Sequence, residues 1–230
     1  MDSTRRETCC CGSWVVREDW PLWLLLAASL VVGIVLYPAL PDRIPLHWNI
    51  QGQIDRYGSK AEGVFGMLAL NVGLYLFFLA LPRFDPRREN YAKFAPTYRF
   101  FRSLFVVFMT VLWGVAMAAA KGMPVDTARV VPLMVSALFI LIGNLMGRVR
   151  YNWFVGIRTP WSLANEEAWR LTHRAAGPAW VLGGLVSLAG AFFGKAVAAV
   201  TMGIGLGGAT IFSVVYSYFA WRRTAGTGRK

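Results

Sequence analysis

The sequence predicts an all-α integral membrane protein, a bundle of six transmembrane helices with both termini in the cytoplasm. Three observations lead to this prediction. Hydrophobic residues make up 56% of the 230 residues, charged residues make up only 16%, and the mean hydropathy is positive. A chain with so little polar surface is not an ordinary soluble domain.

Six apolar stretches are long enough to cross a bilayer, because a hydrocarbon core about 30 Å thick needs about 20 residues of helix. They run approximately over residues 21–40, 63–81, 103–120, 130–147, 175–194 and 196–221. The stretches contain few ionisable residues, which argues against a proton relay through the bundle. Asn71 and Asn144 are expected to hydrogen-bond between helices.

Lys195 alone separates the last two stretches, which predicts a tight antiparallel hairpin of helices. Gly190 and Gly194 in one helix, and Gly203 and Gly207 in the next, have the small-xxx-small spacing of closely packed membrane helices. We interpret them as packing residues, with a homodimer as the alternative.

The distribution of Lys and Arg predicts the orientation in the membrane. Of the 24 basic residues, 18 fall in the segments on one side and six in those on the other. By the positive-inside rule, both termini are therefore cytoplasmic. Topology and contact with anionic lipid explain the net charge of +12, so no direct binding of nucleic acid is expected.

Four segments follow from this topology. A cytoplasmic tail covers residues 1–19, and residues 20–120 form an amino-terminal membrane domain with an external loop at 41–62. Residues 121–221 form a carboxy-terminal membrane domain with a cytoplasmic loop at 148–174, and residues 222–230 form a second tail. Cys9, Cys10 and Cys11 lie on the reducing side, where an incidental reduced cluster is favoured over lipidation or metal binding.

The external loop predicts an extended, half-buried segment, because Ile44, Leu46, Trp48 and Ile50 alternate with more polar positions. Gly52 marks a turn. The loop also contains side chains that could coordinate a cation or hydrogen-bond a peptide, namely His47, Asn49, Asp55 and Lys60. It lacks the three strong ligands of a catalytic metal site, so neither a metal nor another cofactor is expected. The alternative is that these side chains satisfy backbone groups of the turns and fix the loop on the helix ends.

The sequence predicts different roles for the two long cytoplasmic segments. The loop at 82–102 has six basic residues with Tyr91, Phe94 and Tyr98 between them, which indicates an amphipathic segment on the membrane surface. The loop at 148–174 holds three Trp, five Arg, two Glu and one His. Such a segment is more specialised than a connector requires, so it is the leading candidate for a functional site.

Within the second loop, Thr159-Pro160 predicts an extended backbone before a helix that is capped by Ser162 and spans residues 163–174. Its spacing places Glu166, Trp169, Arg170 and His173 on one face, with Glu166 paired to Arg170 and Arg158 able to join. The network could hold the loop in one shape, bind a partner, or provide an acid and a base. No nucleophile motif is present, so we do not expect an enzyme.

Two motifs resemble the signature segments of the SdpI family of bacterial membrane proteins. The external motif at residues 44–60 is Ile-Pro-Leu-His-Trp-Asn-Ile-Gln-Gly-Gln-Ile-Asp-Arg-Tyr-Gly-Ser-Lys. The internal motif at 152–163 is Asn-Trp-Phe-Val-Gly-Ile-Arg-Thr-Pro-Trp-Ser-Leu, followed at 166–174 by Glu-Glu-Ala-Trp-Arg-Leu-Thr-His-Arg. The first motif is similar to a domain of unknown function that often precedes the SdpI segment. The resemblance extends over residues 20–221.

This resemblance implies a six-helix protein of the bacterial plasma membrane that protects its producer against a secreted killing peptide. It also implies signalling, in which the membrane protein sequesters a small transcriptional repressor at the cytoplasmic face. The lipid bilayer, the peptide toxin and this repressor are thus the implied partners. A membrane-embedded enzyme acting on a lipid or peptide, and a small-molecule transporter, are the alternatives.

The resemblance assigns residues to each motif without assigning their individual roles. The matching positions are His47, Asn49, Gly52, Asp55 and Lys60 outside, and Asn152, Gly156, Arg158, Thr159, Pro160, Trp161, Glu167, Trp169 and His173 inside.

Overall fold

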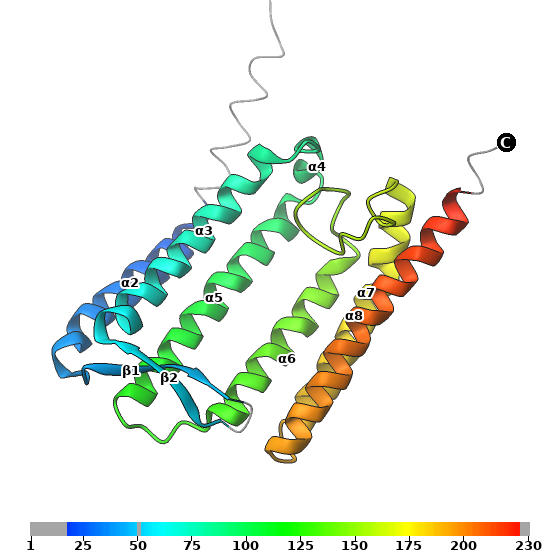
Figure 1. Ribbon diagram of the computed structural model, residues 1–230. Coiled ribbons are helices and arrows are strands. Elements are labelled where there is room, and N and C mark those ends of the chain that lie inside the picture. Colours follow the sequence, from blue (N-terminus) through cyan, green and yellow to red (C-terminus); the bar gives the residue numbers. More distant parts are fainter. Residues whose placement is uncertain (1–17, 50–51, 226–230) are drawn as a thin grey trace, which may run out of the picture.

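The computed structural model describes residues 18–49 and 52–225 and shows a mostly helical membrane protein (Figure 1). Its helices are α2 (Trp20–Leu36), α3 (Met67–Phe84), α4 (Glu89–Ala92), α5 (Ala95–Ala120), α6 (Thr127–Met146), α7 (Glu166–Gly190) and α8 (Lys195–Ala225), with short segments η1 (Tyr37–Ala39) and η2 (Glu62–Gly66). Within the described residues, five helical segments are long and apolar enough to cross a membrane. The predicted cysteine cluster at 9–11 lies outside the described residues.

α7 is the long helix that does not qualify as a span by composition. It occupies the place predicted for the fifth apolar stretch, but its first turns carry Glu166, Glu167, Arg170 and Arg174. The helix is continuous from Glu166 to Gly190 and lies alongside α8 (Figure 1). The charged residues therefore form the first turns of α7 rather than a separate helix.

The prediction of an all-α fold was wrong in one element, because the loop between α2 and α3 contains a β-hairpin. β1 (Arg43–Trp48) pairs antiparallel with β2 (Ile54–Ser59), and Ile44 lies opposite Gly58. The predicted extended segment is confirmed for residues 43–48, whereas Ile50 lies outside the described residues. Alternating side chains stabilise a half-buried strand even within a helical protein.

The hairpin is seated on the ends of α3 and α5 by an apolar cluster. Ile44 is fully buried and packs with Val64, Leu68, Trp113 and Met117. The Trp113 Nε1 donates a hydrogen bond to the Val64 carbonyl at 3.2 Å, which satisfies the indole N–H inside this cluster. The hairpin is therefore part of the folded bundle and is not a free connector.

Small residues bring α6, α7 and α8 into close contact. A Cβ added to Gly183 would lie 2.2 Å from the Gly205 carbonyl oxygen, and one added to Gly190 would lie 1.8 Å from the Thr201 Oγ1. These positions require glycine, as in closely packed membrane helices. Gly194, Gly203 and Gly207 have no neighbour within 4 Å among the described residues, so the predicted packing role is wrong for these three within the described part of the chain. The predicted tight connection between the last two helices is confirmed.

The two intramembrane asparagines behave differently. Asn71 of α3 donates to the Val106 carbonyl at 3.2 Å and to the Thr110 Oγ1 at 3.0 Å, so the predicted bond between helices is confirmed. Asn144 is exposed and donates to the carbonyl of Ile140 in its own helix at 3.1 Å. The prediction was wrong for Asn144, because its side chain points away from the neighbouring helices.

Tyr98 donates a hydrogen bond to a backbone carbonyl of α3 that has no helical donor. Pro82 lies inside this helix and has no N–H, so it leaves the Phe78 carbonyl without its usual helical donor. The Tyr98 hydroxyl of α5 donates to this carbonyl at 2.5 Å. One hydrogen bond therefore satisfies the backbone of α3 and joins it to α5.

We predict that Tyr98→Phe destabilises the protein by about 1–3 kcal/mol, because the buried Phe78 carbonyl then lacks a donor. Thermal unfolding in detergent measures the effect. Tyr57→Phe is the control, since Tyr57 lies on the exposed strand β2. Equal unfolding temperatures for Tyr98→Phe and the unmodified protein would contradict the prediction.

Candidate functional site

The hairpin of β1 and β2, called the outer hairpin after its predicted side of the membrane, presents an exposed polar pair. The His47 Nδ1 lies 2.6 Å from the Asp55 Oδ1, and both side chains are largely exposed. Asn49 instead closes the turn, because its Oδ1 accepts the Gln53 N–H at 2.9 Å and its Nδ2 donates to the Gln53 Oε1 at 3.2 Å. Asn49 therefore satisfies a backbone group of the turn, which was the alternative to ligand binding. The His47 and Asp55 side chains remain exposed, where a ligand could reach them.

Gly52 and Lys60 position the hairpin. Gly52 has a φ of +75°, and a Cβ there would lie 2.5 Å from the Cβ of Ala128, so the tip of the hairpin touches the start of α6. The Lys60 Nζ lies 3.8 Å from the Asp42 Oδ1 and 5.3 Å from the centre of the Tyr37 ring. Gly52 and Lys60 therefore contact other parts of the protein and hold the hairpin in place.

Asn152 organises the start of the segment at 148–174, called the inner loop after its predicted side of the membrane. It is fully buried, and its Oδ1 accepts the N–H groups of Phe154 at 2.9 Å and Val155 at 2.7 Å. Its Nδ2 donates to the carbonyls of Arg150 at 2.8 Å and Val155 at 2.9 Å. The amide thus replaces regular secondary structure in holding this turn.

Asp85, which no sequence pattern singled out, connects the segment at 82–102 to the inner loop. It is 3% exposed, and its Oδ2 accepts from the Trp153 N–H at 2.9 Å and the Tyr91 hydroxyl at 3.0 Å. Burial raises the pKa of Tyr91 above its ordinary value, and the Asp85 carboxylate raises it further. Tyr91, Phe94 and Tyr98 are all buried, so the aromatic side of this predicted amphipathic segment faces protein and not the membrane surface. These aromatics pack against Val149, Val155 and Trp169 of the inner loop and α7.

Arg87 and Asn90 fasten the same two segments. The Arg87 guanidinium lies 3.6 Å from the centre of the Tyr151 ring, and its Nη2 donates to the Tyr151 hydroxyl at 2.8 Å. Asn90 Nδ2 donates to the Tyr151 carbonyl at 2.8 Å. The interleaving of aromatic and polar residues at 85–98 was the sequence signal for this contact, but it was read as contact with lipid.

Trp169 and His173 form the centre of the inner loop. Their rings stack 4.0 Å apart, and the Trp169 Nε1 donates to the Val149 carbonyl at 3.0 Å. The His173 Nε2 accepts the Ile157 N–H at 3.0 Å, so its Nδ1 carries the proton and donates to the Trp169 carbonyl at 2.9 Å. Both ring nitrogens thus contact backbone, and neither is bonded to Glu166 or Glu167, so the alternative of an acid and a base on this face finds no such couple here.

The end of the inner loop is fixed to α8. The Thr159 Oγ1 donates to the Ser217 Oγ at 2.7 Å, and the Trp161 ring lies edge-on to Tyr218. Ser162 donates to the Ile157 carbonyl at 2.6 Å. The prediction that Ser162 caps the helix was therefore wrong. Asn165 is the N-cap, accepting from the Ala168 N–H at 2.8 Å, because the turn already uses Ser162.

The predicted pair of Glu166 with Arg170 was also wrong, because Arg170 pairs with Glu167. The two hydrogen bonds are 2.8 and 2.6 Å long. They lower the pKa of Glu167 and raise that of Arg170, but both groups are exposed, so the pair stabilises little.

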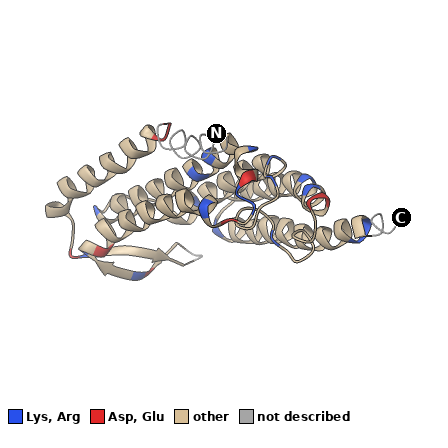
Figure 2. Ribbon diagram, turned by 90° about the horizontal axis from the view of Figure 1, so that it is seen from above, with Lys and Arg blue, Asp and Glu red and all other residues tan. Residues whose placement is uncertain are grey.

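Arg158, Pro160 and Glu166 face outward, as do Glu167 and Arg170. Arg158 is exposed and donates to the Trp153 carbonyl at 3.2 Å, beside the half-exposed Trp153 ring, while Pro160 and Glu166 are also exposed. Figure 2 views the molecule from this end and shows Lys and Arg around the loops. Among the described residues, no group of three or more His, Cys, Asp or Glu could hold a metal ion.

The fold and these two surfaces define a polytopic helical membrane protein with one folded loop at each end of its bundle. The model of the SdpI/YfhL protein family matches residues 148–217, and that of a domain of unknown function, DUF1648, matches residues 24–72. The chain thus contains an SdpI/YfhL family segment, preceded by a DUF1648 segment.

A relative from Bacillus subtilis (strain 168), the immunity protein SdpI, is 24% identical over 204 residues, which cover 89% of this chain and 96% of that protein. No solved structure matches the chain.

We predict that Gly156→Ala destabilises the inner loop by about 2 kcal/mol or more. The φ of Gly156 is +118°, and an added Cβ would lie 2.3 Å from the His173 Nε2. Hydrogen exchange of residues 150–163 measures the loss. Gly147→Ala is the control, because that position has open space; faster exchange in the control than in Gly156→Ala would contradict the prediction.

We predict that the inner loop loses stability as the pH falls from about 6.5 to about 4. Burial lowers the pKa of His173 to about 4, from 6.5, so the unfolded state binds more protons in this window. The loss of folding free energy reaches about 3 kcal/mol at the lower end of this pH window and is absent above pH 6.5. Tryptophan fluorescence against pH measures it. The same pH dependence in His173→Gln would exclude His173 as its source.

Proposed function

We propose that this protein is an immunity and signal-receptor protein of the bacterial plasma membrane, which protects its producer against a secreted antimicrobial peptide. The observation that carries the proposal is the match to the immunity protein SdpI over most of both chains. The folded hairpin supports it, because an exposed His–Asp pair on a rigid support provides a surface for peptide contact.

The proposed topology has six crossings by α2, α3, α5, α6, α7 and α8, with both termini in the cytoplasm. The charged turns of α7 then lie at the cytoplasmic surface, and its apolar part from Ala175 onward crosses the membrane. The basic residues of the inner loop and of the segment at 82–102 support this orientation. The division into membrane domains at 20–120 and 121–221 follows the same scheme.

The inner loop is proposed to bind a small transcriptional repressor. Its fixed shape, its exposed Trp153 and its cationic side chains provide an aromatic and positively charged contact surface. Such a surface complements an acidic patch on a partner. The contribution of Arg158, Pro160 and Glu166 to ligand binding is part of this proposal, as is that of His47 and Asp55 outside.

The function is tested by expression in a toxin-sensitive bacterium that is exposed to killing peptides from the source organism. We expect survival to rise with the unmodified protein and to fall about tenfold with His47→Ala or Asp55→Ala, as for loss of a direct contact. Arg56→Gln is the matched control, because it removes the other ion pair of the same hairpin. Unchanged survival across the peptide panel would reject immunity, and equal loss in the control would assign the effect to hairpin folding.

The topology is tested separately by labelling single cysteines at positions 47 and 158 in a variant that lacks Cys9, Cys10 and Cys11. Reagents that do not cross the membrane should reach position 47 from outside and position 158 only after the cells are opened. Labelling of both positions from one side would contradict the six-helix topology.

A further inference from the structure

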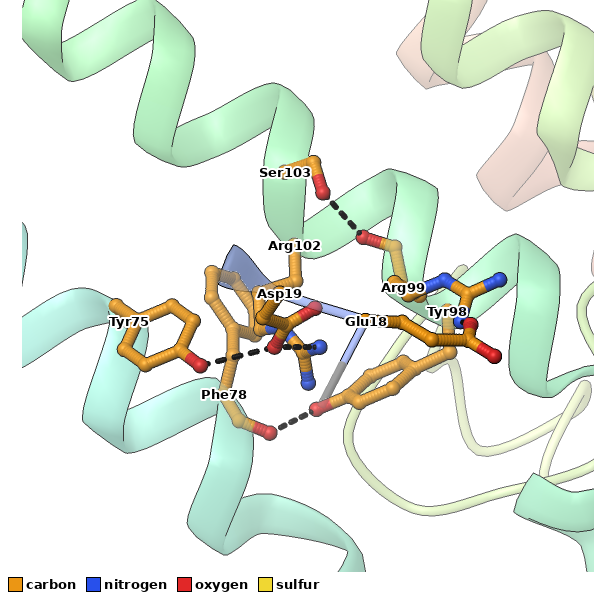
Figure 3. Close-up of polar contacts among 8 residues, drawn as sticks. All are labelled: Glu18, Asp19, Tyr75, Phe78, Tyr98, Arg99, Arg102 and Ser103. Atoms are coloured by element: carbon orange, nitrogen blue, oxygen red, sulfur yellow. Dashed lines mark hydrogen bonds and ion pairs between the residues drawn. The ribbon is translucent and has the colours of Figure 1, made fainter. Parts of the chain in front are cut away.

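A buried ion pair that belongs to neither candidate surface joins α2 to α5. Asp19 directly precedes α2 and is 1% exposed, and Arg102 lies in the third turn of α5 and is fully buried. The Arg102 Nη2 donates to the Asp19 Oδ2, and the Tyr75 hydroxyl of α3 donates to the same oxygen at 2.8 Å (Figure 3). Three helices thus meet at one carboxylate. Hydropathy alone places Asp19 in the tail and Arg102 in a loop, so the sequence does not predict this contact.

The pair is incompletely hydrogen-bonded. The Asp19 Oδ1 and the Nε and Nη1 of Arg102 are buried without a partner among the described groups. Buried ion pairs of this kind are often no more stabilising than apolar packing, and their best-attested role is to specify a register. The pair is therefore better suited to fixing a position than to adding stability.

α2 needs such a constraint, because few of its side chains are buried. Leu22, Leu26, Ser29 and Gly33 form its buried stripe, whereas its exposed large residues are Trp20, Trp23, Leu24, Leu30, Val31, Val32, Ile34 and Val35. In a bilayer, apolar side chains gain little by leaving lipid for another helix. A rotation or shift of α2 would thus change little apolar energy, but it would separate Asp19 from Arg102.

The position of α2 decides where the hairpin lies, because α2 continues through η1 and the turn at residues 40–42 into β1. At this end, a Cβ on Gly33 would lie 3.0 Å from the Val64 Cγ1 and 3.4 Å from the Trp113 ring. Ile44 fits against Gly63 in the same cluster, where an added Cβ would lie 2.7 Å from it. A shifted α2 would therefore displace β1 from its seat.

We propose that Asp19 and Arg102 are positioning residues for the outer hairpin, acting through α2 from the opposite end of the bundle. This inference does not rest on the proposed function, because it concerns how the hairpin is held and not what it binds. It assigns a role at the outer face to two buried residues near the other end of the bundle.

Hydrogen exchange of the purified protein in lipid nanodiscs tests the proposal. Asp19→Asn removes the charge with little change of shape, and we expect the amides at 43–48 and 54–59 to exchange about tenfold faster, with those of α7 and α8 unchanged. Glu18→Gln is the matched control, because it breaks the neighbouring, partly exposed pair of Glu18 with Arg99. Unchanged hairpin exchange in Asp19→Asn would overturn the proposal.

A second variant separates positioning from stability. The triple variant Asp19→Leu, Tyr75→Phe, Arg102→Met removes every polar group of the cluster and leaves no uncompensated charge, so its unfolding temperature should match or exceed that of the unmodified protein. Its hairpin amides should still exchange about tenfold faster, because α2 has lost its register. Normal hairpin exchange in the triple variant would show that the pair acts through stability alone and would overturn the proposal. This variant also decides the question if Asp19→Asn does not fold.

Discussion

The structure depends on one constraint, that a polar group removed from water must find its partner within the protein. In α3, Pro82 cannot donate a hydrogen bond to the Phe78 carbonyl, and the hydroxyl of Tyr98 donates one instead. In the inner loop, Asn152 and Asp85 accept the N–H groups that no regular element pairs. Hydrogen bonds that meet this requirement join neighbouring helices within the bundle. They also hold the inner loop, at one end of the bundle, in a single shape.

The sequence predicted what local patterns encode. Apolar runs gave the long helices, and alternating side chains gave β1. The start of α5 was placed at residue 103 instead of Ala95, because a hydropathy pattern counts Arg102 as a loop residue although it is fully buried. Burial of a charge is decided by a partner, and Asp19 lies far away in the sequence.

The candidate site was predicted less completely for the same reason. Spacing identified Trp169 and His173 as neighbours, and they stack. Asp85 could not be found, because its partner Trp153 lies in a different loop and no periodicity relates them. Ser162 and Asn165 are both suitable helix caps, and only the turn that uses Ser162 determines which of them caps α7.

The contact of Gly52 with Ala128 has a mechanical consequence. It places the tip of the hairpin against the first turn of α6, and the last turn of α6 runs directly into the inner loop. A single rod thus has one end under the outer hairpin and the other at the base of the inner loop, and Pro132 provides a point at which this rod can bend. The tip of the hairpin and the base of the inner loop are therefore connected through one continuous helix, which packs along its length against α7.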